Sequence, residues 1–183
     1  MARRTSLTKD DWLRQAMELL RTDGVGGVRV LTLAKSLGVT RGSFYWHFRD
    51  RGELLDLMLD WWDREMTDTV IDHVDTRSAS ARQRLTALAE NVVSNDKNRF
   101  DNAIRSWAEG DREVATAHRR VMNKRLEYVV SLFRDAGFSP REARARGHLL
   151  AVYVMGEGFI HAGESLETRL RLLRRQIRAL TKA

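Results

Sequence analysis

The apolar residues of this 183-residue chain recur mostly at steps of three and four, which is the spacing of one face of an α-helix. No stretch alternates apolar and polar residues in the way that a half-buried strand does. A single proline, Pro140, interrupts a chain that is otherwise rich in helix-forming residues. The pattern therefore predicts an all-α protein.

Three short helices are expected at the start of the chain. The first begins at Thr8, which forms a capping-box-like sequence with Asp11, and the glycines of TDGVGG at residues 22–27 end it. Its apolar stripe consists of Leu13, Ala16, Met17 and Leu20. Two shorter helices follow over residues 31–37 and 40–47, with Thr40 as the N-cap of the second.

Six longer helices are expected in the rest of the chain. Their ranges are 52–74, 81–95, 99–109, 111–136, 141–162 and 166–181. The sequence DAGFSPREA at residues 135–143 marks one turn, in which Gly137 suits the position after a helix and Pro140 the first residue of the next.

Residues 31–47 fit a helix-turn-helix. Ala34 is small where the two helices would cross, and Gly38 lies in the turn. The inward-facing residues are Leu33, Leu37, Val39 and Phe44. The second helix then exposes Thr40, Arg41, Ser43, Tyr45, Trp46 and His47. A plain bundle of small helices explains the inward residues but not these exposed aromatic side chains among arginines, whereas a helix in the major groove of DNA, about 12 Å wide, explains both.

The positive charge is concentrated in the same segment. The net charge of the chain is +7. Residues 1–52 hold ten Arg and Lys against five Asp and Glu, or +5, and residues 53–183 hold twenty-two against twenty, or +2. We therefore expect a basic module over 1–52 that meets phosphate, followed by a nearly neutral module over 53–183, with a solvated surface as the plainer alternative.

Several classes of protein are disfavoured by composition. There is no cysteine, so disulfides and thiolate metal sites are excluded, and no apolar run approaches the roughly 18 residues of a membrane span. We expect a cytoplasmic protein with no cofactor or metal. Glu157 and His161 lie four residues apart and could hold a metal, but an interface or solvated pair is the favoured interpretation. There is no glycine-rich phosphate loop, nucleophile motif or HExxH sequence, so we do not expect an enzyme.

The stretch LAKSLGVTRGSFYWHFRDRGELL resembles the DNA-binding segment of the tetracycline-repressor (TetR/AcrR) family of transcriptional regulators. The matching positions are Ala34, Gly38, Val39, Ser43, Phe44, Tyr45, His47, Phe48, Arg51, Glu53, Leu54 and Leu55. The resemblance covers about residues 8–60. One departure is Arg29, since the family often has Thr or Ser at this helix cap, so capping there is expected to be weaker.

The resemblance assigns roles to individual residues of the second short helix. It implies that Tyr45 and His47 contact DNA phosphates and that Gly42 allows a close approach of the backbone. Thr40, Arg41, Ser43 and Trp46 are expected near base edges or sugars, and Arg51, which matches a basic residue of the family, is a further candidate DNA contact. Arg41 is the candidate for bidentate contact with guanine, and a phosphate contact is the equal alternative.

The family also implies a second domain that dimerises and usually holds a ligand cavity. The candidate pocket residues, within 52–162, are Trp62, Met66, Phe100, Ile104, Trp107, Met122 and Tyr153. A filled core is the alternative for each of them. The basic stretch HRRVMNKR at 118–125 is interpreted as a solvated face.

The last two helices are expected to form the dimer contact. Leu166, Leu170, Leu173, Ile177 and Leu180 form a narrow apolar seam. The preceding helix offers the small residues Ala143, Gly147 and Ala151 at steps of four. The alternative is that the seam covers the core of its own chain.

Together these features predict a homodimeric repressor that binds a near-palindromic operator in double-stranded DNA. A small-molecule effector would release it. A DNA-binding regulator without a ligand, including an activator, is one alternative, and an enzyme that keeps the helix-turn-helix as a structural bundle is the other.

Overall fold

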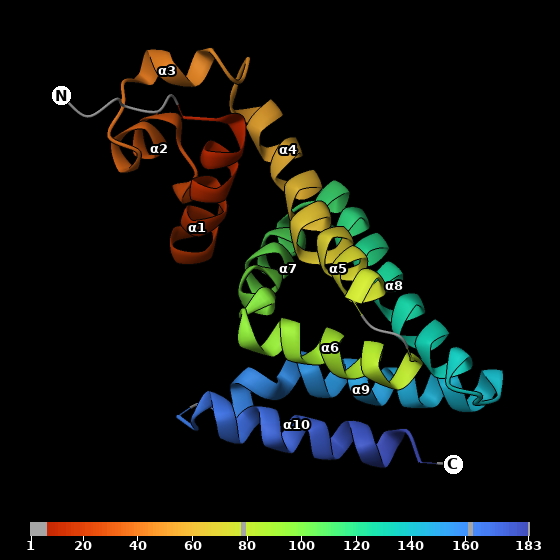
Figure 1. Cartoon of the computed structure of the whole chain (residues 1–183). Helices are drawn as coiled ribbons and strands as arrows, with labels where there is room; N and C mark the ends of the chain where they lie inside the picture. Colours follow the sequence, from red (N-terminus) through yellow and green to blue (C-terminus); the bar gives the residue numbers. More distant parts are fainter. Residues whose placement is uncertain (1–6, 78–79, 161–162, 183) are drawn as a thin grey trace. The chain divides into compact units, whose positions relative to one another are not determined.

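The computed structural model describes residues 7–77, 80–160 and 163–182 (Figure 1). Within these ranges every regular element is a helix, so the predicted all-α fold is confirmed. The chain divides into two compact units, Met1–Arg64 with Arg99–His118, and Glu65–Asn98 with Arg119–Ala183. No helix in the described ranges is both long and apolar enough to cross a membrane. The predicted functional division into 1–52 and 53–183 stays a prediction.

The first unit contains the three short helices that the sequence predicts, followed by two longer ones. They are α1 (Lys9–Gly27), α2 (Val30–Ser36), α3 (Arg41–Tyr45), α4 (Arg51–Asp63) and α7 (Asp101–Gly110). Thr8 caps α1 in a capping box with Asp11, as expected. The end of α1 differs from the prediction, because helical turns continue to Gly27 beyond a kink at Gly24, whose φ is 68°.

Aromatic side chains form the centre of the first unit. Trp12 is fully buried, and its ring centroid lies 5.6 Å from that of Phe44 in an edge-on contact. Phe44 stacks on Phe48 at 5.0 Å. Trp62 is also buried, and its Nε1 donates a hydrogen bond of 2.8 Å to the Asp101 carboxylate.

The long helix expected over residues 52–74 is present but interrupted. Residues Arg64–Asp68 form a π-helical turn, η1, between α4 and α5 (Thr69–Arg77). Such turns are rare and disturb the regular ladder of backbone hydrogen bonds. Thr67 lies buried inside this turn. The first unit's segment ends at Arg64, so the turn begins where the chain passes from one unit to the other.

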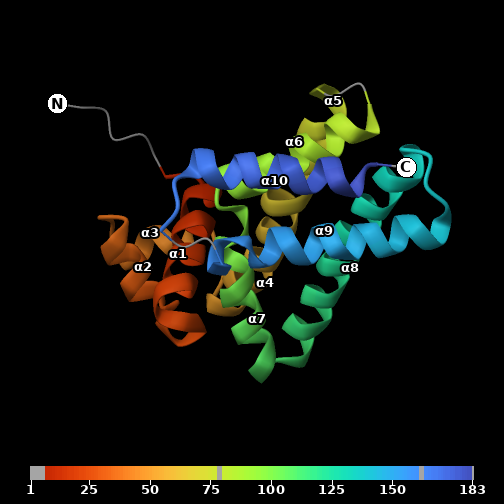
Figure 2. The same cartoon turned by 90° about the horizontal axis from the view of Figure 1, so that it is seen from below.

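The second unit packs α6 against α5, α9 and α10. Its remaining bounds are α6 (Ala81–Ser94), α8 (Arg112–Asp135), α9 (Pro140–Ile160) and α10 (Leu166–Leu180), with a short 3-10 turn, η2 (Lys97–Phe100), before α7. Figure 1 and Figure 2 show α6, α9 and α10 lying side by side. Ion pairs tie these helices together: Arg169 of α10 donates two hydrogen bonds, of 2.6 and 2.5 Å, to the buried Glu157 carboxylate of α9.

The core of the second unit corrects part of the predicted dimer contact. Leu173 and Ile177 are fully buried against residues of α6, α8 and α9, and Leu170 packs against the same cluster. Gly147 also serves this chain's own packing, since a Cβ at this position would lie 2.7 Å from Cγ2 of Val130 in α8. Ala151 lies half-buried on α9. A residue that is buried within its own chain cannot supply the area for a second copy, so Leu173, Ile177 and Gly147 serve the core of their own chain. Leu170 and Ala151 are only partly buried, and their place in a dimer contact stays a prediction.

Candidate nucleic-acid interface and ligand cavity

The turn between α2 and α3 has the geometry that the sequence predicts. Gly38 adopts a φ of 67°, which is the left-handed region that favours glycine. Its N–H donates to the Lys35 carbonyl at 3.1 Å, and the N–H of Val39 donates to the Ala34 carbonyl at 2.9 Å. These bonds satisfy the last carbonyls of α2 and turn the chain sharply into α3. Arg29 makes no side-chain cap for α2, in agreement with the weaker capping expected there.

The buried rings beneath α3 decide which side chains face outward. Phe44 and Phe48 are buried against Trp12, so the residues between and before them cannot share that face. Trp46 is 89% exposed and Tyr45 is 48% exposed. α3 itself ends at Tyr45, and Trp46 and His47 occupy the turn that follows, slightly earlier than the sequence predicts. Two large rings are therefore accessible to a partner in one short segment.

Arg41 and Tyr45 form a pair on the outer face of α3. Nη2 of Arg41 donates to the Tyr45 hydroxyl at 2.9 Å, and the guanidinium carbon lies 5.6 Å from the centroid of the ring. The contact spans one helical turn and orients both groups. Beside it, Thr40 and Ser43 are joined by a hydrogen bond of 3.2 Å between their hydroxyls. The four side chains therefore present a guanidinium and three hydroxyl groups on one small surface.

Gly42 has no structural reason to be glycine within this chain. Its φ lies outside the left-handed region, and an added Cβ would meet only the Thr40 hydroxyl, at an ordinary distance of 3.6 Å. Glycine in a helix is otherwise unfavourable by about 0.5–1 kcal/mol relative to alanine. The chain's own packing therefore leaves room for a side chain at position 42.

Two predicted DNA contacts lie differently from their neighbours. His47 is half-buried, with its ring centroid 6.1 Å from that of Trp12. Arg51 points inward: its Nε donates to the Val28 carbonyl and its Nη2 to the Val25 carbonyl, each at 2.6 Å. This corrects the interpretation of Arg51, because its guanidinium fixes the link between α1 and α2 to the start of α4.

An acid beside this surface is fully engaged. Glu53 accepts hydrogen bonds from the backbone N–H and the Nε of Arg49, at 2.8 and 3.2 Å, and pairs with Lys9 at 3.4 Å. The Arg49 N–H is the main reason that the pKa of Glu53 lies below its ordinary value. Most of the Arg49 side chain nevertheless stays exposed, so the surface beside α3 keeps accessible positive charge.

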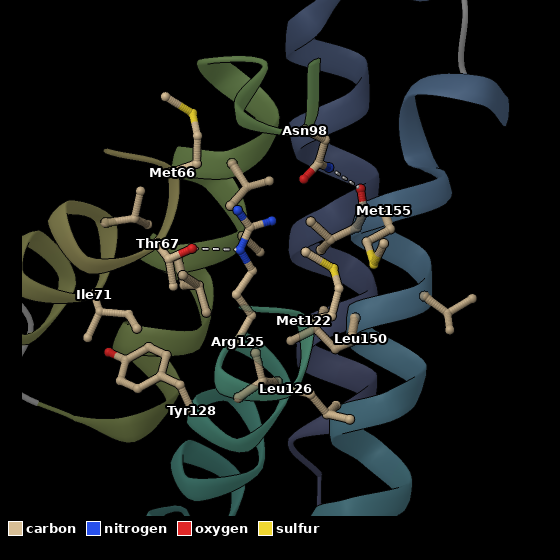
Figure 3. A pocket seen from close by; sticks show the side chains of 18 of the residues that line it. Met66, Thr67, Ile71, Asn98, Met122, Arg125, Leu126, Tyr128, Leu150 and Met155 are labelled. Carbon is tan, nitrogen blue, oxygen red and sulfur yellow. Dashed lines mark hydrogen bonds between the residues drawn. The ribbon is translucent and has the colours of Figure 1, made fainter. Parts of the chain in front are cut away.

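A cavity of about 320 Å³ lies within the second unit (Figure 3). Its walls come from η1, α5, α6, α8 and α9, with Asn98 between α6 and α7. The lining residues are Met66, Thr67, Val70, Ile71, Leu88, Ala89, Val92, Asn98, Met122, Asn123, Arg125, Leu126, Tyr128, Val129, His148, Leu150, Ala151, Val152, Val154 and Met155. His148, Val152 and Met155 are also exposed, so the cavity opens beside this face of α9.

Three of the cavity's polar side chains are held by hydrogen bonds. Nε of Arg125 donates to the Thr67 hydroxyl at 2.8 Å, and Nδ2 of Asn98 donates to the Val154 carbonyl at 3.1 Å (Figure 3). The Tyr128 hydroxyl donates to Asp75 at 2.6 Å. Burial raises the pKa of Tyr128, and the bond to the Asp75 carboxylate raises it further.

The predicted pocket residues are divided by the structure. Met66 and Met122 line the cavity. Trp62, Phe100 and Ile104 are instead buried in the core of the first unit.

Two more predicted pocket residues lie elsewhere. Trp107 lines a separate hollow of the first unit, and Tyr153 packs against the core of the second unit. The sequence interpretation missed Arg125, which it placed on a solvated basic face. The available signal was its spacing, since Arg125 follows Met122 by three residues and so shares its side of α8.

One face of α9 carries exposed apolar residues. Leu149, Val152 and Phe159 are 61%, 70% and 73% exposed, at helical steps of three and seven, and Met155 lies between them. The opposite side of the same helix is buried in the core through Ala143 and Leu150. A helix that is apolar on all sides is usually buried on all sides, so this face is expected to be covered.

The described residues contain no group of three or more acidic or histidine side chains that could hold a metal ion. Of the pair considered from the sequence, Glu157 binds Arg169, and His161 lies outside the described residues.

A sequence profile described as bacterial regulatory proteins, tetR family, matches residues 13–58, which contain α2, the turn and α3. This segment is a tetR-family segment. The tetracycline repressor protein class C of Escherichia coli is 24% identical to this chain over 151 residues, or 82% of the chain and 64% of the repressor. The class E repressor of Escherichia coli is 27% identical over 75% of the chain and 60% of its own length. The chain thus spans less than two thirds of these two relatives.

Sequence identity is higher over a shorter stretch. The HTH-type transcriptional regulator AcrR of Shigella flexneri is 40% identical over 58 residues, or 30% of this chain and 27% of AcrR. Solved structures of transcriptional regulators share the whole fold. A TetR transcriptional regulator from Legionella pneumophila superposes with a TM-score of 0.79 at 16% identity, covering 98% of this chain and 100% of the other. A transcriptional regulator from Saccharomonospora viridis in complex with choline gives 0.76 at 17% identity, covering 93% and 95%.

Proposed function

We propose that this chain is a ligand-responsive repressor of the tetR family. Two copies bind a near-palindromic operator in double-stranded DNA, and a small molecule that binds in the cavity of the second unit releases them. The proposed DNA contacts are Thr40, Arg41, Gly42, Ser43, Tyr45, Trp46 and His47.

The exposed surface of α3 carries the proposal. Trp46 and Tyr45 are large, exposed and fixed in place by the buried Phe44 and Phe48 beside them. Arg41, Thr40 and Ser43 add donors and acceptors of the kind that contact phosphates and base edges. This combination suits a nucleic-acid partner better than a protein partner, because the whole module is basic and Gly42 leaves its backbone approachable.

The apolar face of α9 supports the homodimer. One helix-turn-helix contacts only a half-site, and two related by symmetry contact half-sites about one helical turn apart or a multiple of it. Leu149, Val152 and Phe159 are exposed apolar side chains that such a two-fold contact would cover. We assign the contact to this face rather than to Leu173 and Ile177.

The cavity supports the effector. Its volume lies in the range of small-molecule sites, about 300–1,000 Å³, and its mostly apolar wall with a few fixed polar groups is typical of them. The structure of the Saccharomonospora viridis regulator with choline is an instance of this fold with a small molecule bound. Release requires that the ligand and the operator favour different conformations, with a coupling that is typically about 1–3 kcal/mol and reciprocal.

The test is selection of DNA fragments from a random library by the purified chain, followed by mobility-shift titration at several salt concentrations. We expect a near-palindromic consensus and an affinity that falls steeply with salt, because counterions are released from the contacted phosphates. Trp46→Ala should retain its helicity and lose this binding. If no consensus emerges, or if Trp46→Ala binds the consensus as tightly as the parent, α3 is not the DNA-binding element.

The dimer is tested separately by Leu149→Asp, with Arg141→Asp as a control on an exposed position of the same helix. A carboxylate at position 149 should yield folded monomers in light scattering. These monomers should lose tight operator binding and keep weak, salt-sensitive binding to any DNA. A dimeric Leu149→Asp with unchanged operator affinity would rule out this face as the contact.

A further inference from the structure

The cavity's wall specifies the chemical class of its ligand. Fourteen of its twenty lining residues are aliphatic or methionine. Tyr128 supplies the one phenyl or indole ring among the described lining residues, and its hydroxyl is bound to Asp75. Met66, Met122 and Met155 stand on three different elements, and methionine side chains adapt their shape to flexible apolar partners. Such a wall fits an unbranched aliphatic chain better than a flat aromatic molecule.

The charge of the lining favours an anion. Arg125 is its one Lys or Arg, and none of the described residues that line it is Asp or Glu. A cationic ligand would lose its hydration without gaining a carboxylate partner from this wall, which is costly. Quaternary ammonium ligands are commonly bound by several aromatic rings, and the single ring of Tyr128 does not form such a cage.

Arg125 is positioned before any ligand arrives. Its Nε is bound to the hydroxyl of Thr67, which is itself buried within the π-helical turn. Figure 3 shows the Arg125 side chain extending from α8 between Thr67 and Met66 on one side and Met122 and Asn98 on the other. The planar guanidinium suits carboxylates in particular, because its N–H groups match the two oxygens.

We propose that the cavity binds an aliphatic carboxylate, with the carboxylate at Arg125 and the hydrocarbon chain along the methionine-rich wall. The inference rests on the proposed function in taking this cavity as the effector site, and it names the effector's class. Straight-chain alkanoates are the simplest representatives.

The test is titration calorimetry of the full-length protein, without DNA, with decanoate, decanol and decyltrimethylammonium below their aggregation concentrations. Decanoate should bind at least about tenfold more tightly than decanol, which is the scale of one charged hydrogen-bonded contact. The ammonium compound should not bind measurably. Shortening decanoate to octanoate should weaken binding by about fourfold for each CH₂ lost.

Two substitutions locate the carboxylate. Arg125→Gln should remove the preference for decanoate over decanol, and Arg125→Lys should keep the charge but lose part of the preference with the bidentate fork. Arg144→Gln is the matched control, since Arg144 lies on the surface of α9 and pairs with Glu127. Circular dichroism checks that each variant is folded. Equal binding of the three compounds to the parent protein, or an unchanged preference in both folded Arg125 variants, would overturn the proposal.

A cavity-filling variant and the selected operator separate this inference from the proposed function. Ala151→Phe should abolish decanoate binding, and binding that survives it would place the alkanoate on the surface instead. If decanoate binds in the cavity but the chain selects no DNA, the proposed function fails and the ligand class stands. If the chain binds its operator and another compound releases it while no alkanoate binds, the ligand class fails and the function stands.

Discussion

Gly42→Ala separates a requirement of folding from a requirement of DNA binding. The substitution adds one methyl group to α3, at a position where the chain itself leaves room. The added Cβ would lie 3.6 Å from the Thr40 hydroxyl, which is an ordinary van der Waals contact, and no left-handed backbone angle stands in the way. Nothing in the first unit therefore opposes alanine.

Stability and DNA affinity should consequently change in opposite directions. Alanine is favoured over glycine in helices by about 0.5–1 kcal/mol, and part of this gain should appear because Gly42 lies in the first turn of a five-residue helix. If the α3 backbone approaches DNA closely, the added methyl group would clash with the DNA. Overpacking typically costs about 1–3 kcal/mol, or roughly 5- to 150-fold in affinity.

Urea denaturation measures the first effect, and mobility-shift titration on the selected operator measures the second. Gly110→Ala is the matched control, because an added Cβ there meets nothing within 4 Å and Gly110 lies at the end of α7, away from the α3 surface in sequence. We expect the control to keep its operator affinity. An unchanged affinity for Gly42→Ala would refute the close approach of this backbone to DNA, whereas a lowered urea midpoint would refute the reasoning about space within the chain.

Three further outcomes follow from the same geometry. Tyr45→Phe should weaken binding similarly on every DNA sequence. Arg41→Ala should reduce the discrimination between bases at one operator position by about 1–3 kcal/mol if Arg41 is bidentate to guanine. Uniform losses of affinity across a panel of mutated operators would make Arg41 a phosphate contact. Gly147→Ala should destabilise the second unit by about 1–3 kcal/mol in urea denaturation, because its Cβ would meet Val130, and a neutral result would show that α8 and α9 can separate at no cost. Hydrogen bonds to Glu53 and Glu142, chiefly from Arg49 and Ser139, lower their pKa values in the folded state. Their stabilisation is therefore present above the ordinary value of 4.5 and is lost as the pH falls through the lowered pKa, so urea midpoints should drop below about pH 4.5 and respond less to acid in Glu142→Gln.

The helix-turn-helix could be predicted from the sequence because its determinants are local. Gly38 needs a left-handed backbone, Ala34 must be small, and Phe44 can be buried only if Tyr45 and Trp46 are not. Each of these requirements acts within a few residues, so spacing alone identifies them. The contact between Trp12 and Phe44 was not predicted. Trp12 lies on α1 and Phe44 on α3, and tertiary packing rather than the apolar pattern of α1 brings the two rings together.

The residues of the cavity were predicted less well, because tertiary packing rather than local spacing decides which side chains line it. Large apolar residues such as Trp62, Phe100 and Ile104 fill a core as readily as they line a pocket, and the sequence does not state which helices pack against them. Arg51 shows the complementary limit. The resemblance marks it as a basic position that contacts DNA, but hydrogen bonds to the Val25 and Val28 carbonyls, more than twenty residues earlier, direct its guanidinium inward.

A single apolar stripe, as on α10, is weaker evidence for a dimer contact than a second apolar face that its own chain leaves exposed, as on α9. The leucine seam of α10 was predicted to be an intermolecular contact. One neighbour is enough to bury a single apolar stripe, and the core of the second unit buries this one at Leu173 and Ile177. α9 is different, because both of its sides are apolar while its own chain covers only one. The residue left over on such a helix, Leu149, therefore carries more information about a partner than any leucine of the seam, and it is the position at which a single carboxylate distinguishes the two interpretations.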